Sequence, residues 1–413
     1  MKKKWILVGL IIFLCGSSYL VGYTLNREGK ESSYKNLDLF GETLSIIQKK
    51  YVEDKKFKDL IYGALSGMAS SLDSYSQFLK PEDYRELLVE TEGKFGGLGI
   101  EITMIDGLLT IVSPIEGTPA EKAGLKPGDI IIKIDGEVTK GITLNDAVQK
   151  LRGDPGEKVT VTILRESDHR IEDVMIVRDI IKIQDIREAI IIADTIGYVK
   201  LTEFREKTAR DLDTALKKLT KEKMEAVILD LRNNPGGLLL SAVDIASRFL
   251  ATGEVIVSTK SRKEEKLVYK SVPYAKKYLD RPMVVLINRG SASASEIVAA
   301  ALKDNKRAIL VGERSFGKAS VQSVVPLSDG SALRFTSAKY YTPSGESIHE
   351  KGVSPDITIE RQEFVVEEEE AEDVFEKIKD KTTKKEFDYT KDYQLLRAVD
   401  LIKGLLVLHS PKE

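Results

Sequence analysis

The chain of 413 residues contains little cysteine and little histidine, and this scarcity limits the chemistry that it can perform. Its single cysteine, Cys15, lies in an apolar N-terminal stretch, so the remainder of the chain offers no disulfide, no cysteine nucleophile and no thiolate metal ligand. The three histidines, His169, His349 and His409, lie in no motif that would serve a serine nucleophile. We therefore expect no metal site, no cofactor, and a catalytic base of another residue type.

The chain also lacks an excess of charge of either sign. Its 63 Lys and Arg nearly balance its 65 Asp and Glu, for a net charge of −2, and no basic stripe of the kind found in nucleic-acid-binding domains is present. We therefore expect no nucleic-acid partner. With 42% hydrophobic and 31% charged residues the composition is that of an ordinary globular protein, and the length allows two or three domains.

The N-terminus has the features of an export signal. Three lysines at positions 2–4 precede the apolar run Trp5–Tyr23, which is close to the about 20 residues that cross a bilayer. No Ala-x-Ala cleavage site follows, and a buried core helix is unexpected behind three lysines. We expect residues 1–30 to be an uncleaved signal-anchor in the cell membrane, with the other domains outside the cytoplasm. Cleavage would make the protein secreted.

Two segments with different residue patterns precede residue 180. Apolar residues recur at helical spacing over residues 31–90, where Pro81 suits the first turn of a short helix. Residues 91–178 are instead short β-rich runs separated by glycines, with one helical run at Leu144–Leu151. Strands and short helices in this order predict a compact, partly open β-barrel.

Residues 179–360 alternate strands with helices, which predicts an α/β core with a largely parallel sheet. The run Pro282–Asn288 has the continuous apolar character of a fully buried strand. Residues 361–413 begin with an acidic run and a lysine-rich run, which we interpret as a solvated link. The apolar helix predicted over Tyr393–Leu408 docks either on its own core or on a second subunit, so a homodimer is one possibility.

Three segments of the α/β core carry candidate catalytic residues. In the first, the buried strand leads through small residues around Ser293 into a helix, and a helix N-terminus favours developing negative charge. The alternative is that these serines only cap the helix, with Ser295 in that position. The second segment, 312–322, contains a Gly-Lys pair, and the third, 230–237, ends in Gly-Gly after a strand. The three segments together indicate a catalytic site more specifically than any one of them does alone.

These segments resemble those of the carboxyl-terminal processing (tail-specific) serine proteases over about residues 36–360. The resemblance rests on Gly-Gly-Leu-Gly-Ile, Leu-Arg-Asn-Asn-Pro-Gly-Gly, Ser-Ala-Ser-Ala-Ser-Glu-Ile and Gly-Glu-Arg-Ser-Phe-Gly-Lys-Ala-Ser-Val-Gln. The stretches Lys339–Gly345 and Gly352–Asp356 belong to it as well. It implies a crotonase/ClpP-like α/β core joined to a PDZ domain, with Ser293 as nucleophile, Lys318 as base and Gln322 orienting the lysine. The early helical segment resembles the family less closely, because Leu72–Ser76 differs from the sequence that the family usually has there.

A serine–lysine mechanism places demands on the surroundings of the lysine. Lys318 acts as a base only when neutral, so its pKa has to fall from ~10.4 toward 7–8, which predicts an apolar pocket that Phe316 and Val321 help to form. Residues four apart on a strand are ~13 Å apart, so we expect a turn from Lys318 to Gln322 before a strand at Ser323–Leu327.

Candidate oxyanion donors lie in two of the three segments. A tetrahedral intermediate needs N–H groups aimed at its developing negative charge. We expect these from the backbone of Ala294 and of Gly236 or Gly237.

The PDZ-like unit predicts a binding site for protein C-termini. Its loop of Gly96, Gly97, Leu98 and Gly99 matches the carboxylate-binding loop of PDZ domains, because successive N–H groups of a glycine-rich loop form an anion nest. The following strand can pair with an extended peptide, whose apolar side chains would enter a pocket formed partly by Ile100 and Ile102. The alternative is a tight turn without a ligand.

Arg152 ends the helix that should border this groove. A solvated surface arginine is the plain interpretation. The sharper hypothesis is that Arg152 bonds either the bound peptide or the protease core, and so couples peptide binding to activity.

The leading hypothesis is thus an extracytoplasmic serine endopeptidase that binds protein or peptide substrates by their C-termini. One rival is a catalytically silent, membrane-tethered PDZ scaffold, and a second is a thioester or acyl-group enzyme of the crotonase type. The intact Ser293, Lys318 and Gln322 argue against the scaffold, and the attached PDZ unit argues against the acyl-group enzyme.

Overall fold

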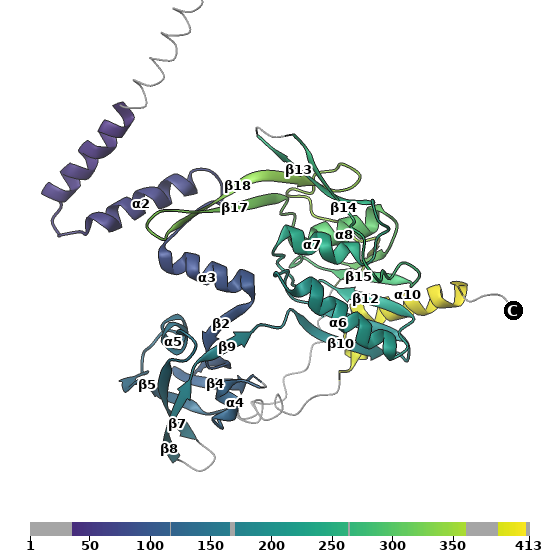
Figure 1. Ribbon diagram of the computed structural model, residues 1–413, viewed down its shortest axis with the longest axis horizontal. Coiled ribbons are helices and arrows are strands. Elements are labelled where there is room, and N and C mark those ends of the chain that lie inside the picture. Colours follow the sequence, from purple (N-terminus) through teal and green to yellow (C-terminus); the bar gives the residue numbers. More distant parts are fainter. Residues whose placement is uncertain (1–34, 116, 166–169, 263–264, 361–386, 410–413) are drawn as a thin grey trace, which may run out of the picture. The chain divides into compact units, whose positions relative to one another are not determined.

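The computed structural model describes residues 35–115, 117–165, 170–262, 265–360 and 387–409, which fall into two compact units, Met1–Lys80 and Pro81–Glu413 (Figure 1). The first unit is helical, as expected, with a helix over residues 35–50 and α2 (Phe57–Ser70), followed by the short strand β1 (Gln77–Leu79). The predicted signal-anchor and the charged link after residue 360 lie outside the described residues. Among the helices that are described, none has the length and apolarity to cross a bilayer.

The second unit begins with α3 (Pro81–Glu92), in which Pro81 occupies the first position as predicted, and continues into an antiparallel sheet with the order β3-β4-β5-β7-β8. The strands are β3 (Ile100–Ile105), β4 (Leu108–Pro114), β5 (Ile130–Ile134), β7 (Lys158–Arg165) and β8 (Arg170–Val177), with β6 (Glu137–Val138) beside β5. Helices α4 (Pro119–Lys122) and α5 (Leu144–Leu151) complete the body. Its apolar core includes the fully buried Ile111, Ile131 and Ile163.

A two-stranded ribbon marks the entrance and the exit of this body. Strand β2 (Lys94–Gly97) pairs antiparallel with β9 (Asp179–Lys182), so the chain enters and leaves the PDZ-like unit at one place. Arg205 holds both connections on the α/β core, because its side chain donates to the backbone oxygen of Glu90 before β2 and to the carboxylate of Asp185 after β9.

The α/β core is built on a six-stranded sheet with the order β10-β11-β12-β15-β16-β19. All neighbouring strands are parallel except the edge pair β10 and β11. The strands are β10 (Ile186–Ile192), β11 (Ile196–Leu201), β12 (Ala226–Asp230), β15 (Met283–Ile287), β16 (Ile309–Gly312) and β19 (Ile357–Thr358). Every residue of β12 and β15 is buried, which confirms the fully buried strand predicted from the apolar run.

Helices cover both faces of this sheet, because side chains alternate along each strand. Val227 and Leu229 of β12 pack with α6 (Thr208–Lys221), α7 (Leu239–Ser247) and α8 (Ala294–Asp304). The intervening side chains of β12 face the other way and pack with α10 (Tyr393–His409), whose buried positions are Leu395, Ala398, Val399 and Ile402. The C-terminal helix therefore docks on its own core, one of the two alternatives that the sequence left open.

A second, antiparallel sheet lies beside these layers and carries the lysine segment. Strands β13 (Val255–Ser261) and β14 (Leu267–Lys270) pair with each other, β13 pairs with β18 (Ala332–Tyr341), and β18 pairs with β17 (Ser320–Pro326). Because β16 ends at Gly312 and β17 begins at Ser320, the segment between them, which contains Lys318, connects the two sheets.

Candidate active site

Ser293 lies on a strained turn between a buried strand and a helix. Strand β15 ends at Ile287, and Ser293 takes the N-cap position of α8 with φ +53° and ψ −112°, a backbone conformation that costs a residue with a side chain of order 1–3 kcal/mol. Ser295, predicted as the cap, is instead inside the helix, and its Oγ donates to the backbone oxygen of Asn234 at 2.9 Å. The turn therefore presents Ser293 at the positive end of a helix.

A single buried carboxylate connects this turn with the lysine segment. Glu296 has no exposed surface, and its Oε2 accepts from the backbone N–H of Ser293 at 2.8 Å and of Lys318 at 2.9 Å. Its Oε1 accepts from the hydroxyl of Ser315 and the N–H of Gly317, both at 2.6 Å. Glu296 thus fixes the backbone of the candidate nucleophile and that of the candidate base relative to each other. Sequence reasoning missed this role, although the Ser-x-x-Glu spacing was a signal.

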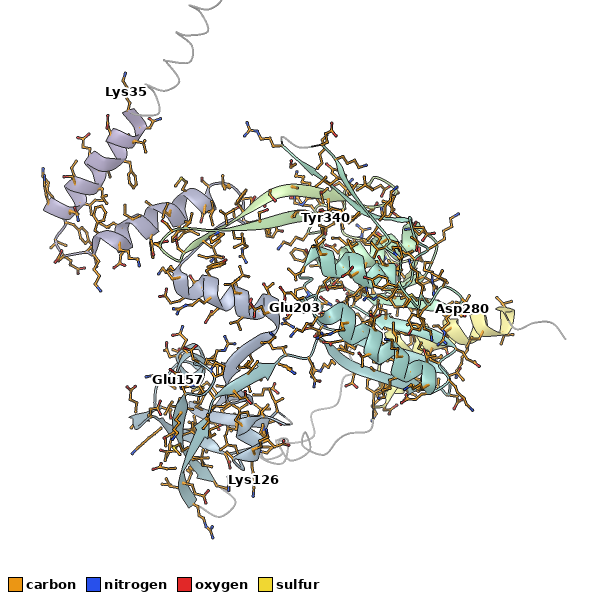
Figure 2. All side chains as sticks on the ribbon, viewed as in Figure 1. Lys35, Lys126, Glu157, Glu203, Asp280 and Tyr340 are labelled. Carbon is orange, nitrogen blue, oxygen red and sulfur yellow. The ribbon has the colours of Figure 1, made fainter. Side chains whose placement is uncertain are left out.

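Tyr340, labelled in Figure 2, lies on β18 and contacts the same group of residues. Its hydroxyl donates to the backbone oxygen of Lys318 and lies 3.2 Å from the backbone oxygen of Ser293 and 3.5 Å from Oε2 of Glu296. Burial, together with the nearby carboxylate of Glu296, raises the pKa of Tyr340 well above its ordinary value. The phenol therefore stays protonated at working pH and remains a donor. Tyr340 lies in the family-like stretch Lys339–Gly345, but it was given no role in the site from the sequence.

The three residues implied as catalytic line one cavity. Its volume is about 230 Å³, and its walls come from the Gly-Gly loop, the start of α8, and β17 and β18. The lining residues are Pro235, Gly237, Leu238, Leu239, Ser293, Ile297, Lys318, Ser320, Val321, Gln322 and Tyr340. Segments separated by about 55 and 25 residues in the sequence therefore meet here, as the resemblance implied.

The predicted turn between Lys318 and Gln322 is wrong, because β17 begins at Ser320 and includes Gln322. The register of β17 on β18 shifts at this place, from Val321 opposite Ala338 to Gln322 opposite Thr336. The ladder therefore contains a β-bulge at Gln322, with the extra residue, Ser337, on β18.

Gln322 is held by this bulged ladder. Its amide nitrogen donates to Oγ1 of Thr336 at 2.7 Å, while its buried Oε1 has no partner among the described residues. An acceptor without a partner therefore lies at the wall of the cavity.

The predicted apolar wall around the lysine is half right. Val321 is partly buried, packs against the core and lines the cavity. Phe316 is 57% exposed and does not contribute, because its N–H bonds to the backbone oxygen of Ser291 at 3.0 Å and the ring remains in solvent.

Of the candidate oxyanion donors, the geometry favours Ala294 and Gly237. Ala294 is the first residue of α8, so its N–H has no acceptor within the helix. The N–H of Gly236 donates to Oδ1 of Asn234 at 2.9 Å and is therefore occupied, which excludes one of the two predicted glycines. Gly237 lines the cavity instead, and backbone hydrogen bonds from Phe204 to Gly236 and from Leu238 to Phe204 fix its position.

Gly236 has a different reason to be glycine. Its φ is +108°, and a Cβ there would lie 2.8 Å from Cβ of Ser293 and 2.9 Å from the nitrogen of Ala294. The loop can approach the nucleophile this closely only because Gly236 has no side chain.

In the PDZ-like unit, the predicted glycine loop divides between a strand and a turn. Gly96 and Gly97 belong to β2 and pair with Ile180 and Asp179, so they do not form a loop as predicted. Leu98 is buried in the core of the unit, and Gly99, at φ +77°, leads directly into β3. The turn before β3 is therefore shorter than the sequence indicated.

Ile100 and Ile102 of β3 are partly buried against the same core. Arg152 is the C-cap residue of α5, and its guanidinium lies 4.8 Å from the ring centroid of Phe95 in β2. A cation placed over an aromatic face is stabilised there. The hypothesis that Arg152 bonds a peptide or the protease core remains a prediction.

Among the residues that the structure describes, no group of three His, Cys, Asp or Glu side chains is arranged to hold a metal ion.

Comparison with known proteins identifies the family. The model of Peptidase family S41 matches residues 195–359, and that of the PDZ domain matches residues 110–165. The Carboxy-terminal-processing protease of Bartonella bacilliformis is 43% identical over 365 residues, covering 87% of this chain and 83% of that protein. The chain belongs to the carboxy-terminal processing proteases of family S41.

Further similarities agree with this assignment. Carboxy-terminal processing protease CtpA of Bacillus subtilis is 36% identical over 356 residues, covering 86% of this S41 chain and 75% of its own length. A candidate S41 protease from Bacteroides fragilis, solved by crystallography, has the same fold, with a TM-score of 0.50 and 17% identity over 88% of this chain and 97% of that one. The protein is therefore a serine peptidase with a PDZ domain, as the sequence indicated, on a mixed α/β core.

Proposed function

We propose that this S41 peptidase cleaves protein substrates with Ser293 as the nucleophile and Lys318 as the general base. The observation that carries the proposal is the shared carboxylate of Glu296, which holds the backbone of both residues while their side chains line one cavity. Among the residues that the structure describes, no histidine lines this cavity. Lysine is therefore the candidate base that the site offers.

The proposed reaction follows the usual order of acyl transfer. The neutral amine of Lys318 takes the proton from Oγ of Ser293 as this oxygen attacks the scissile carbonyl carbon. The N–H groups of Ala294 and Gly237 stabilise the oxyanion of the tetrahedral intermediate. The protonated lysine then gives its proton to the leaving amine, and water activated by the same lysine hydrolyses the acyl-enzyme.

Gln322 fits the role of orienting the lysine. Its Oε1 is buried in the wall of the cavity with no partner among the described residues, and it can accept a hydrogen bond from the amine of Lys318. With its amide nitrogen bonded to Oγ1 of Thr336, the amide has its oxygen left for the cavity.

Removing either reactive side chain tests this mechanism. Ser293→Ala and Lys318→Ala should each lower the rate at which an unfolded test protein is cleaved by about 1,000-fold or more, because each removes a group that acts in the chemical step. Lys221→Ala, on the exposed surface of α6, is the matched control and should cleave like the unaltered enzyme. Gel-based cleavage rates measure the difference, and equal rates for all proteins would reject the mechanism.

We further propose that the PDZ domain delivers substrates by their C-termini. The edge of β3 and the short turn from Leu98 to Gly99 offer an extended peptide a strand partner and backbone N–H groups for its carboxylate. Partly buried Ile100 and Ile102 supply apolar contacts beside it.

A blocked C-terminus tests this recognition. A test peptide with a C-terminal amide should bind the inactive Ser293→Ala protein about 10- to 100-fold more weakly than the same peptide with a free carboxylate, because a charge-assisted contact is lost. Calorimetric titration measures both affinities. Equal affinities for the amidated and the free peptide would show that the domain does not recognise the C-terminal carboxylate.

We propose an extracytoplasmic location at the membrane, supported by the three lysines and the apolar run at the N-terminus. Cell fractionation of the full chain should place it with the membranes, with an unprocessed N-terminus on sequencing and with the catalytic domain open to external protease. A chain begun at residue 31 should lose this location. Recovery of the full chain in the cytosolic fraction would contradict the proposal.

A further inference from the structure

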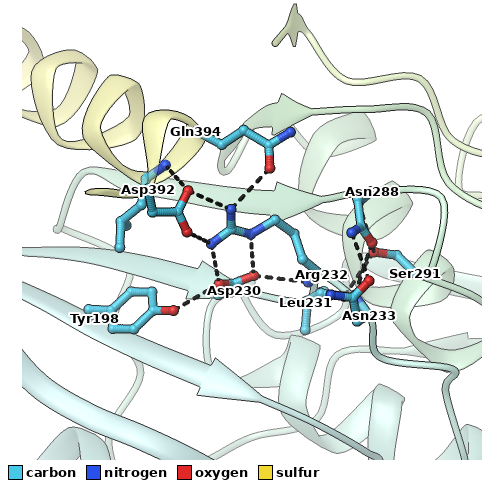
Figure 3. A network of polar contacts seen from close by, with 10 residues as sticks. Tyr198, Asp230, Leu231, Arg232, Asn233, Asn288, Ser291, Asp392 and Gln394 are labelled. Atoms are coloured by element: carbon cyan, nitrogen blue, oxygen red, sulfur yellow. Dashed lines mark hydrogen bonds and ion pairs between the residues drawn. The ribbon is translucent and has the colours of Figure 1, made fainter. Parts of the chain in front are cut away.

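The side chain of Arg232 lies immediately after the central strand β12 and is almost fully buried, with 9% of its surface exposed (Figure 3). A buried guanidinium needs a partner for each of its five N–H groups. Asp230 supplies two, because its oxygens accept from Nε at 3.0 Å and from NH2 at 2.7 Å. Asp230 also accepts from the hydroxyl of Tyr198 at 2.8 Å, which fixes the carboxylate in turn.

The other three N–H groups bond to residues of the C-terminal segment. Asp392 accepts from NH1 at 2.9 Å and from NH2 at 2.7 Å, and Oε1 of Gln394 accepts from NH1 at 3.0 Å. Burial would raise the pKa of Asp392, but the hydrogen bonds and charge of Arg232 outweigh this and hold that pKa below its ordinary value. Asp392 therefore stays ionised at neutral pH. The contact joins positions about 160 residues apart in the sequence.

The C-terminal segment is itself firmly placed. The buried face of α10 packs on the sheet, and Nε2 of Gln394 donates to the backbone oxygen of Ile359 at 2.7 Å. Asp392 and Gln394 therefore offer Arg232 acceptors at fixed positions rather than on a mobile tail.

Arg232 also begins the loop that reaches the candidate oxyanion hole. On one side of it, the backbone oxygen of Leu231 accepts from the hydroxyl of Ser291 at 2.8 Å. On the other side, the backbone oxygen of Asn234 accepts from the N–H of Ala292 at 3.0 Å and from the hydroxyl of Ser295 at 2.9 Å. The nucleophile turn and the start of α8 are thus bonded to the loop on both sides of Arg232, one residue before it and two residues after it.

We propose that Asp392 and Gln394 are positioning residues for catalysis: by fixing Arg232 they hold the loop of residues 231–237 against the nucleophile turn. The proposal rests on the function proposed above for Ser293 and Gly237. In the described part of the chain, neither Asp392 nor Gln394 lines the catalytic cavity, so their effect passes through Arg232. The C-terminal segment is on this account a part of the catalytic domain rather than an appendage.

The test compares two Asp→Asn changes around the same helix in the full chain. Asp392→Asn replaces one acceptor oxygen with a donor facing Arg232, whereas Asp400→Asn alters a half-exposed ion pair with Arg397. Asp392→Asn should lower kcat by about 10- to 100-fold with KM changed less than about threefold, since displacing a catalytic group by about 1 Å costs on the order of 100-fold. Asp392→Glu should recover part of this loss, and Asp400→Asn should behave like the unaltered enzyme.

Rates are measured well below the melting temperature of each variant, so that a loss of kcat reports geometry and not unfolding. A normal kcat for folded Asp392→Asn would overturn the proposal. If that variant does not fold, Gln394→Ala tests the proposal instead, because it removes only one acceptor of Arg232. A fall in kcat of several-fold for Gln394→Ala supports the proposal, and an unchanged kcat overturns it. Ser293→Ala is assayed in parallel, and activity there would reject the proposed function itself rather than the role of Asp392.

Discussion

The buried carboxylate of Glu296 fixes the backbone of the proposed nucleophile, Ser293, relative to that of the proposed base, Lys318. It has no exposed surface, and four groups donate to it: Oε2 accepts from the N–H of Ser293 and of Lys318, and Oε1 from the hydroxyl of Ser315 and the N–H of Gly317. Breaking a buried, fully bonded carboxylate away from its partners costs several kcal/mol. The strained backbone of Ser293 can therefore persist, because surrounding bonds offset the 1–3 kcal/mol that such a conformation costs.

The parallel sheet explains why the three segments meet. The loops that follow β12, β15 and β16 leave the carboxyl ends of adjacent parallel strands, and such ends share one edge of a sheet. The first loop brings Gly237, the second Ser293 and the third Lys318. The buried faces of the strands set these positions, with α8 and α10 packed on opposite sides. The order of the strands alone therefore places the three segments next to one another.

Residues in short contiguous motifs could be predicted from the sequence, and residues that act across the fold could not. The family resemblance named Ser293, Lys318 and Gln322 from local motifs, the structure brings all three to one cavity, and the elements around them were placed to within a few residues. Asp392 comes from a distant segment and carries no local signal, whereas Tyr340 lies in the family-like stretch Lys339–Gly345 but was given no role from the sequence. The predicted turn at Gln322 is wrong because pairing with β18 extends β17 back to Ser320, which depends on a partner strand distant in the sequence. Between Gly236 and Gly237 the sequence could not choose, because the bond from the N–H of Gly236 to Asn234 depends on the folded loop.

The account is tested most directly by the kcat of the full chain carrying Glu296→Gln, measured at a temperature where calorimetry shows the variant folded. The amide keeps the size of the side chain but replaces one acceptor oxygen with a donor, so at least one of the bonds to the Ser293 turn and the lysine segment is lost. We expect kcat to fall by about 100-fold, while Glu222→Gln on the exposed end of α6 leaves it unchanged. A kcat for Glu296→Gln within twofold of the unaltered enzyme would contradict the account.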